Sequence, residues 1–422
     1  MRIDLNTAVA QAGANLIRLL GGSERARFVG GCVRDRILGR QPKDWDIATT
    51  HPWQRVKAIL NEYEIEVKET GTDFGTVTAV VMVDNHHYPF EITTLRRDLD
   101  TDGRRATVVE YSEDWYEDAL RRDFTMNALY AGLEGQVYDP LGTGVQDAEN
   151  RCVRFVGDAR ARIGEDYLRI LRFFRFNARF GGKIDEESFL ACKAMAPGMD
   201  RLSRERVRME LWSILREKYA FSTILIMVGA GVTDDILGKN LDIYRYERIM
   251  TMSLYNDIWT PACLAALNPD PDIIRGLRFD RETENRILTA MSDVMDLEKI
   301  RDLDPKRLQH IAYKYKDAYL AQDVIAVSLV HNFDYLDLFD IMEDNDLFDI
   351  TVPEFPLQGR DLQEKGYMEG PGIGVILKHL EDKWVKSDFE LTRAELVAMI
   401  PKPSTGETFS PWTVSPVNRD KL

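Results

Sequence analysis

The sequence predicts an α+β protein, in which a strand-containing amino-terminal unit precedes a longer, mostly helical region. Short strand-like runs separated by turns fill residues 1–150. From about residue 151 the strand signals fade, and apolar residues recur at the three- and four-residue spacing of amphipathic helices. The chain has 422 residues, of which 44% are hydrophobic, enough to bury a large core and to form more than one packed unit.

Alternating apolar and polar residues, bounded by polar or glycine-containing turns, indicate the strands of the first unit. The first strand ends in the pair Gly30-Gly31 and leads into a short helix that Gly39 closes. A later helix has Pro52 near its start, a position that proline favours. We expect strands over 27–31, 44–49, 74–83 and 88–96, and helices over 32–39 and 51–63.

The rest of the chain is expected to contain a polar loop and then helices. Residues 97–114 are polar and contain glycine, as in a mobile loop, and 115–132 read as a helix. The clearest helical patterns cover 164–180 and 203–219, the second with Ser203 as its N-cap. The expected domains are 1–150, 151–225, 226–350 and 351–400, with a flexible terminus over 401–422.

Charge is unevenly distributed along the chain. The formal net charge is −15, which on its face argues against a nucleic-acid partner. Residues 151–183, however, contain nine lysines and arginines but only three acids. A local basic stripe on an acidic protein is therefore the pattern that a functional account has to explain.

Cysteine usage and hydropathy favour a cytoplasmic protein. The four cysteines are widely separated, without metal-knuckle or CxxC spacing, so reduced thiols are expected. No run of about 18 uncharged apolar residues is present, and so no membrane span is expected. The first residues carry an early acid and have the pattern of an amphipathic helix rather than of an export signal.

Three carboxylates are candidate metal ligands. Asp44 and Asp46 lie two residues apart in an expected strand and so share one face, and Glu91 lies on a later expected strand. Like charges so close together repel, and a cation between them removes the repulsion. Converging carboxylate oxygens suit Mg²⁺, which supports in-line phosphoryl displacement. A lone D-x-D pattern is more often a solvated turn, and a lone Glu91 a surface residue.

The glycine pair changes those odds. Gly30 and Gly31 stand at a strand end before a helix, where backbone N–H groups can approach a phosphate and Arg34 can add a cation. A glycine pair alone is usually a plain turn. Its combination with V-R-D and, about ten residues later, D-x-D is far rarer, and favours phosphate chemistry.

A third cluster occupies the expected helix over 115–132. Arg122, Asp123 and Asn127 fall on about two helical turns, where spacings of three and four residues share a face. These side chains could contact a sugar hydroxyl or a phosphate. A salt-bridged helix start would explain the cluster equally well without the other motifs.

The helix over 164–180 is the most informative. Asp166 and Arg169 carry acceptors and donors that can read a base edge, so they could meet a free nucleotide in place of a template strand. Arg172 and Arg175 continue the same ridge, toward a triphosphate or a nucleic-acid backbone. An exposed helix with ion pairs is the alternative explanation of this pattern.

Taken together, these motifs resemble the class II tRNA nucleotidyltransferases, the CCA-adding enzymes, and most closely their alphaproteobacterial and mitochondrial branch. The similarity runs in family order from about Phe28 to Phe180. The matching strings are GGCVRD, KDWDIATT, GTVTAV, FEITTLRRDLDTDGRRA, DALRRDFTMNAL and VRFVGDARARIGEDYLRILRFFRF. Phe74 departs from the family pattern, because many relatives have histidine there, and a change in packing is the expected reason.

The resemblance implies a polymerase-β-like nucleotidyltransferase head with a mixed β-sheet, followed by an all-helical neck, body and tail. It implies template-independent addition of C, C and A to the 3′ end of tRNA from CTP and ATP, with Mg²⁺ as cofactor. No membrane partner is implied, and the expected assembly is a monomer or a homodimer.

The resemblance also assigns roles to residues. Asp44 and Asp46 become metal ligands and, with Glu91, the catalytic carboxylates. Gly31 and Arg34 would meet the triphosphate, Arg122 and Asp123 the ribose, while Asp166 and Arg169 would select C and A over U and G. The full set of expected nucleotide-binding residues is Gly30, Gly31, Arg34, Arg122, Asp123, Asn127, Asp166, Arg169, Arg172 and Arg175.

Other functions stay open at this point. A bacterial poly(A) polymerase would share the head, and an enzyme that adds only C or only A would share nearly every motif. The loop over 98–113 is where such activities would differ. A catalytically inactive tRNA-binding protein is a further alternative, although a binding protein has no need of the acid pair.

Overall fold

The computed structural model separates into two compact units, Met1–Ser292 and Asp293–Leu422. The finer division into head, neck, body and tail stays a prediction. The residues that the structure describes are 1–101, 106–253, 260–296, 300, 303–333, 338 and 350–402.

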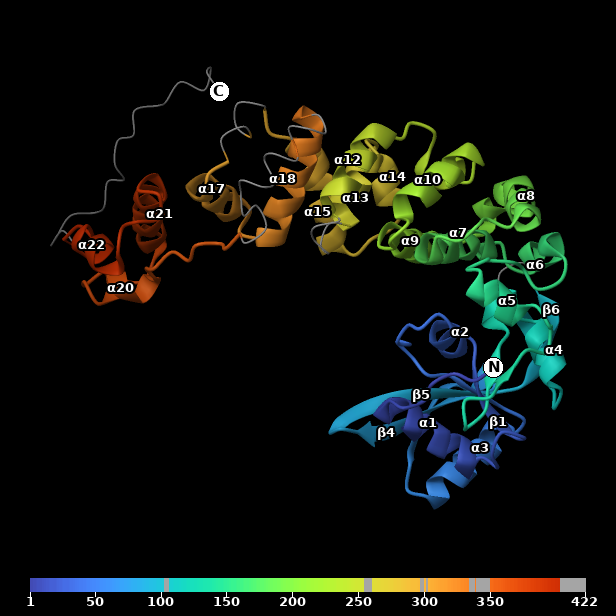
Figure 1. Ribbon diagram of the computed structural model, residues 1–422. Coiled ribbons are helices and arrows are strands. Elements are labelled where there is room, and N and C mark those ends of the chain that lie inside the picture. Colours follow the sequence, from blue (N-terminus) through green and yellow to red (C-terminus); the bar gives the residue numbers. More distant parts are fainter. Residues whose placement is uncertain are drawn as a thin grey trace. The chain divides into compact units, whose positions relative to one another are not determined.

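A seven-stranded mixed sheet forms the core of the first part of unit Met1–Ser292, in the order β3-β4-β5-β2-β1-β8-β9 (Figure 1). β2 and β5 pair in parallel, and the other neighbours pair antiparallel. The expected α+β fold is therefore confirmed. The strands are β1 (Ala26–Val29), β2 (Ile47–Thr49), β3 (Glu66–Gly71), β4 (Thr76–Val83), β5 (His86–Thr94), β8 (Tyr130–Ala131) and β9 (Val137–Tyr138).

Two helices, α1 (Ala8–Leu19) and α3 (Trp53–Glu62), cover one face of this sheet (Figure 1). The approach of α1 is close, because a Cβ at Gly13 would lie 2.5 Å from the ring of Phe28 and 3.0 Å from that of Phe90. Successive side chains of a strand point to opposite faces. The neighbours of those two phenylalanines, Val29 and Glu91, therefore point to the other face, which is free to form a site.

Two expectations about residues 97–132 are wrong. The expected loop forms a separate two-stranded antiparallel sheet of β6 (Arg96–Thr101) and β7 (Ala106–Tyr111), while residues 102–105 of that loop lie outside the described residues. The expected helix stops early, because α4 covers only Trp115–Leu120 and a 3₁₀ turn follows at Thr125–Asn127. Phe124 is instead extended and pairs with Phe155 in an isolated bridge.

The continuous helix expected over 164–180 is also wrong. α6 (Ala159–Glu165) ends before Asp166, and α7 begins afterwards (Leu168–Phe180). Asp166 has an extended backbone with φ −156°, and its carboxylate accepts a hydrogen bond of 3.0 Å from the backbone N–H of Leu168. A short acid that bonds to the chain two residues onward competes with helix continuation.

The remaining part of unit Met1–Ser292 is helical, as expected, and Ser203 caps α9 through a 3.4 Å bond from the backbone N–H of Arg206. No helix in the described part of the chain is long and apolar enough to cross a membrane. The other helices of this unit are α2 (Gly31–Ile37), α5 (Gly144–Glu149), α8 (Glu186–Met195), α9 (Arg204–Leu215), α10 (Ala220–Gly229), α11 (Asp234–Leu237), α12 (Ile243–Ser253), α13 (Thr260–Leu267), α14 (Pro271–Gly276) and α15 (Arg281–Ser292).

The regular secondary structure in the described residues of unit Asp293–Leu422 is helical. Trp384 and Leu380 of α21 and Leu396 of α22 are buried in one hydrophobic cluster of this unit. The described helices are α17 (Pro305–Tyr315), α18 (Ala318–Asn332), α20 (Gly359–Gln363), α21 (Pro371–Lys386) and α22 (Arg393–Ala398). Most of the expected flexible terminus, residues 403–422, lies outside the described residues.

Candidate active site

A cavity of about 570 Å³ lies within unit Met1–Ser292. One wall comes from the uncovered face of the sheet, and the other from the α6–α7 junction and from α9. Its size is that of a typical small-molecule pocket. The lining residues are Val29, Asp46, Phe74, Thr76, Glu91, Thr93, Arg96, Arg121, Arg122, Asp123, Glu165, Asp166, Leu168, Arg169, Arg172 and Arg206.

The sheet wall brings two of the three expected carboxylates together. Ile47 and Ile92 are register partners in the parallel pair β2–β5, so the preceding residues, Asp46 and Glu91, stand side by side at the pocket. Asp44 and Asp46 lie before β2 and not inside a strand, which corrects the expected position. The side chains still alternate between the two faces, because Trp45, between the two acids, is buried against Phe28.

Asp44 does not line the cavity and is exposed. Its negative charge still acts on the carboxylate of Asp46. Burial and, after it, the charges of Glu91 and Asp44 together raise the pKa of Asp46 to about 6. In the described residues no three carboxylate, histidine or cysteine groups are drawn together into a ready-made metal cage. The donor set is therefore one of repelling hard oxygens that a divalent cation would neutralise.

This repulsion predicts a pH-dependent effect on stability. In metal-free protein, Asp46→Asn is expected to raise the free energy of unfolding by about 2 kcal/mol at pH 8. Because burial and the neighbouring charges of Glu91 and Asp44 raise the pKa of folded Asp46 to about 6, the folded state bears the cost of its ionised carboxylate above that pH. The gain should disappear as the pH falls to about 4, where the wild-type carboxyl is protonated in the folded state. Urea unfolding of wild type and Asp46→Asn at these two pH values measures the gain in the free energy of unfolding. An equal gain at both pH values would show that it does not come from the ionised carboxylate of Asp46.

The glycine turn lies beside a partly buried arginine, Arg122. Gly30 has φ +73°, a conformation that L residues rarely adopt, and a Cβ there would lie 3.4 Å from Nη1 of Arg122. Arg122 in turn bonds Asp118 at 2.9 Å, and the hydroxyl of Tyr130 donates to the same carboxylate at 2.7 Å. Burial alone would raise the pKa of Asp118, but Arg122 and Arg121 hold it well below its usual value. The turn therefore presents a fixed guanidinium to the cavity.

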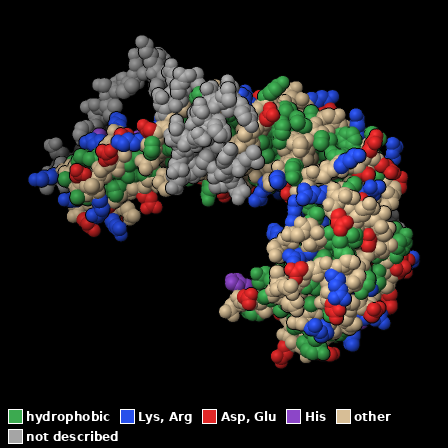
Figure 2. All heavy atoms as spheres, in the orientation of Figure 1, with side chains coloured by type: hydrophobic (Ala, Val, Ile, Leu, Met, Phe, Trp, Pro, Cys, Tyr) green, Lys and Arg blue, Asp and Glu red, His purple; other side chains and the backbone are tan. Residues whose placement is uncertain are grey.

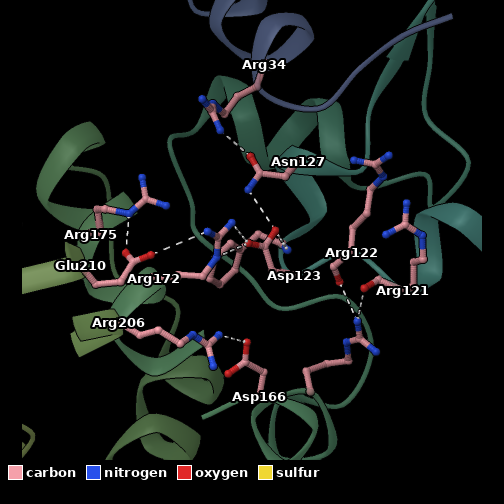
Figure 3. A network of polar contacts seen from close by, with 12 residues as sticks. Arg34, Arg121, Arg122, Asp123, Asn127, Asp166, Arg172, Arg175, Arg206 and Glu210 are labelled. Atoms are coloured by element: carbon pink, nitrogen blue, oxygen red, sulfur yellow. Dashed lines mark hydrogen bonds and ion pairs between the residues drawn. The ribbon is translucent and has the colours of Figure 1, made fainter. Parts of the chain in front are cut away.

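Arg34 does not line the cavity, and its expected contact with a triphosphate stays a prediction. It is buried, with only 3% exposed, and its Nη2 bonds Asp35 at 2.8 Å. Its Nη1 donates to Oδ1 of Asn127 at 2.5 Å, and Nδ2 of Asn127 donates to Asp123 at 3.1 Å. Arg34 and Asn127 thus stand behind Asp123 rather than in the pocket lining (Figure 3).

The α6–α7 junction brings Asp166 and Arg169 to the same cavity, although not as a mutual pair. Oδ2 of Asp166 accepts a 2.7 Å bond from Arg206 of α9. Arg169 pairs with Glu165 and donates to the backbone oxygen of Arg162 at 2.6 Å. The expected ridge of residues three apart is thus replaced by two ion pairs on one wall of the pocket.

Arg172 and Arg175 are likewise paired with acids. Arg172 bonds Asp123 at 2.6 Å, and Arg175 bonds Glu210 of α9 at 2.6 Å (Figure 3). Burial would raise the pKa of Asp123, but the charge of Arg172 holds it well below its usual value. Of these two arginines only Arg172 lines the cavity.

These pairs explain how an acidic chain carries a basic stripe. On the face shown in Figure 2, the basic side chains of unit Met1–Ser292 are interspersed with acidic ones. Several arginines of the stripe spend part of their donors on Asp35, Asp123, Glu165 or Glu210. The stripe is therefore a set of positioned donors rather than an unscreened positive patch.

Several lining residues were not expected from the sequence. Thr76 and Thr93 follow from strand alternation, since both share the Glu91 face, and their hydroxyls lie 2.9 Å apart. Arg96 lies over the ring of Phe74, 5.5 Å from its centroid, and donates to its backbone oxygen. Arg206 had no signal in the sequence beyond its place on a helix with several arginines.

Comparison with known proteins supports one family. Residues 26–154 match the family described as "Poly A polymerase head domain", and residues 182–242 the one described as "Probable RNA and SrmB- binding site of polymerase A". The mitochondrial CCA tRNA nucleotidyltransferase 1 of Danio rerio is 34% identical over 89% of this chain and 86% of its own length. The CCA-adding enzyme of Lactococcus lactis is 30% identical over 93% of this chain and 97% of its own.

Solved structures share the fold. The Bacillus stearothermophilus CCA-adding enzyme in complex with CTP matches with a TM-score of 0.66 and 24% identity, over 92% of this chain and 95% of that one. The Thermotoga maritima CCA-adding enzyme complexed with tRNA matches with a TM-score of 0.62 and 19% identity, over 94% and 95%. At these identities the likeness establishes the architecture alone. On the evidence of the sequence relatives, this chain belongs to the family of CCA tRNA nucleotidyltransferases, the CCA-adding enzymes.

Proposed function

We propose that this protein adds C, C and A in turn to the 3′ end of tRNA, using CTP and ATP and no nucleic-acid template. One observation carries the proposal: a single cavity has the carboxylates Asp46 and Glu91 on one wall and Asp166 and Arg169 on the other. The first pair suits phosphoryl transfer and the second pair suits recognition of a base edge. Such a combination supports an enzyme that chooses its nucleotide through its own side chains.

In the proposed reaction, the terminal 3′-hydroxyl of tRNA attacks the α-phosphorus of the nucleotide. A bond forms between the 3′-oxygen and phosphorus, the bond to the bridging oxygen of the β-phosphate breaks, pyrophosphate leaves, and the hydroxyl proton passes to solvent water. Asp46 and Asp44, with Glu91 as the third carboxylate, would hold Mg²⁺. Bound there, the ion would favour the ionised 3′-oxygen and neutralise the charge of the leaving group. The carboxylates position the ion, and Arg122 beside Gly30 positions the nucleotide.

The proposed base selection uses the opposite wall. The ionised carboxylate of Asp166 accepts a hydrogen bond from the exocyclic amino group that C and A both carry. The guanidinium of Arg169 donates to a ring or carbonyl acceptor of the same base. Uracil and guanine present a carbonyl oxygen where C and A present an amino group, so that Asp166 meets an acceptor and not a donor. Asp123 and Arg172 would contact the ribose and the triphosphate.

The proposed setting is the cytoplasm, with tRNA, CTP and ATP as partners and a monomeric or homodimeric assembly. All four cysteines are free thiols, which suits a reducing compartment. Three of them, Cys32, Cys192 and Cys263, are buried. Burial raises the pKa of Cys32 to about 12, and so this thiol is unreactive although it lies beside the backbone oxygen of Asp46.

Stepwise extension of defined tRNAs tests the function. Purified protein with Mg²⁺ and each NTP, singly and in pairs, is incubated with transcripts that lack CCA, CA or only A. We expect CTP alone to add two residues to the first transcript, ATP alone to complete the third, and growth to stop after the terminal A.

The alternatives give different products in the same assay. Long A tails on any RNA would identify a poly(A) polymerase, and growth that stops after C, or that requires a preformed CC end, would identify a C-only or A-only enzyme. Binding of tRNA without any incorporation would leave an inactive tRNA-binding protein. Each of these results would contradict the proposal.

A further inference from the structure

We propose that Arg206 of α9 is a positioning residue that sets base selection by holding the carboxylate of Asp166 in place. The inference rests on the proposed function, because it concerns the residue proposed to read the base. Arg206 and Asp166 both line the cavity, and Nη2 of Arg206 donates to Oδ2 of Asp166 at 2.7 Å. The two side chains are 21% and 18% exposed, so the pair is largely shielded from water.

Asp166 needs such a holder because its backbone belongs to no helix. It stands between α6 and α7 with φ −156° and ψ 106°. Its carboxylate is therefore oriented by the groups that it binds: Oδ1 accepts the N–H of Leu168 at 3.0 Å, and Oδ2 accepts Arg206. The first bond, from the backbone, fixes the position of Oδ1. The second bond fixes the rotation about the last side-chain torsion.

The other end of the ion pair is held from the same helix. Arg206 and Glu210 lie four residues apart on α9 and share one face. Glu210 bonds Arg175 of α7 at 2.6 Å. This face of α9 is thus tied to α7 and to the junction before it, so Arg206 approaches Asp166 from a supported position.

The bond between Arg206 and Asp166 explains why loss of Arg206 should weaken base selection. A carboxylate oxygen has two lone pairs, so Oδ2 can accept Arg206 and still accept the amino group of C or A. Without Arg206 the carboxylate can turn, and its acceptors no longer face the base in one fixed geometry. The loss would fall on discrimination against U and G, because the residues proposed for chemistry lie on the sheet wall.

Steady-state incorporation with each of the four NTPs tests the proposal in the full-length protein. In Arg206→Gln, the preference in kcat/KM for CTP over UTP is expected to fall about tenfold, within the worth of one base contact. The kcat with CTP should change far less than that preference. Arg206→Lys keeps a charged donor and should recover most of the preference. Arg204→Gln is the matched control, since Arg204 is exposed on the same helix and bonds the backbone oxygen of Asp235 at 3.0 Å.

A double-variant cycle separates this role from a general loss of structure. If Arg206 acts through Asp166, Arg206→Gln should add nothing to the lost discrimination of Asp166→Asn. Full discrimination in Arg206→Gln, or an additive loss in the double variant, would overturn the inference while Asp166 stays a base-reading residue. Should Arg206→Gln not fold, Arg206→Met, which also lacks the charged donor, and its double variant with Asp166→Asn decide by the same criteria. Failure of wild-type protein to add C and A would instead overturn the proposed function.

Discussion

Replacing Asp46 with alanine is expected to reduce nucleotide incorporation by roughly 10³-fold or more, because a bound metal ion supplies several kcal/mol of transition-state stabilisation. Asp46 stands beside Glu91 at the cavity, and its carboxylate is destabilised by burial and by neighbouring negative charge. Asp44→Ala is expected to abolish transfer as well. Among the described residues neither acid forms an ion pair, so neither substitution leaves a partner unpaired, and the fold and tRNA binding should survive.

The measurement is single-turnover extension of tRNA, with tRNA affinity and thermal unfolding measured on the same samples. Asp200→Ala is a suitable control, because Asp200 is an exposed acid of the same unit that does not line the cavity. If Asp46→Ala transferred nucleotides at the wild-type rate, the sheet carboxylates would not be the catalytic groups. If it lost tRNA binding to the same extent as transfer, the effect would be structural.

The second large effect is expected for Arg169→Ala, which should relax the choice of nucleotide before it removes activity. The preference for CTP over UTP should fall by about 10- to 100-fold, the usual worth of a well-placed contact with a base edge. The substitution leaves Glu165 with an ion-pair partner, because Glu165 keeps its 2.6 Å bond to Arg162. Lost discrimination can therefore be separated from lost stability.

Competition between CTP and UTP, and between ATP and GTP, on one tRNA end measures this ratio directly. Arg160→Ala is the matched control, since Arg160 is an exposed arginine of α6 outside the cavity lining. Discrimination equal to wild type in Arg169→Ala would remove Arg169 from the proposed base-reading pair and leave selection to other residues.

Local sequence patterns predicted the parts of the fold that depend on local physics. Strands β4 and β5 follow from alternation, and α9 from its helical pattern and the Ser203 cap. The same alternation placed Glu91 on the site face, and the D-x-D spacing kept Asp44 and Asp46 on one side of buried Trp45.

The errors arose where distant residues override local preference. Residues after Leu120 have a helical composition, yet Phe124 pairs with Phe155 and the N–H of Thr125 donates to the backbone oxygen of Arg154 at 2.9 Å. These partners lie about thirty residues further along the chain, and no local pattern reveals them.

The ion-pair partners within the site were hidden for the same reason. Nothing in the sequence near Arg34 indicates that it is buried with Asn127, or that Arg206 reaches Asp166 forty residues earlier. Sequence spacing instead suggested that Asp166 and Arg169 act on one continuous helix. The structure keeps both at the cavity but gives each a different partner.

The central claim is that Asp166 recognises the amino group of the incoming base, and an atomic substitution in the nucleotide tests it most directly. Wild-type protein should prefer CTP about 10- to 100-fold over an analogue that carries hydrogen in place of the 4-amino group. Asp166→Ala should incorporate the two nucleotides with nearly equal kcat/KM. A full preference for CTP in Asp166→Ala would show that the amino group is recognised elsewhere, and would contradict the account.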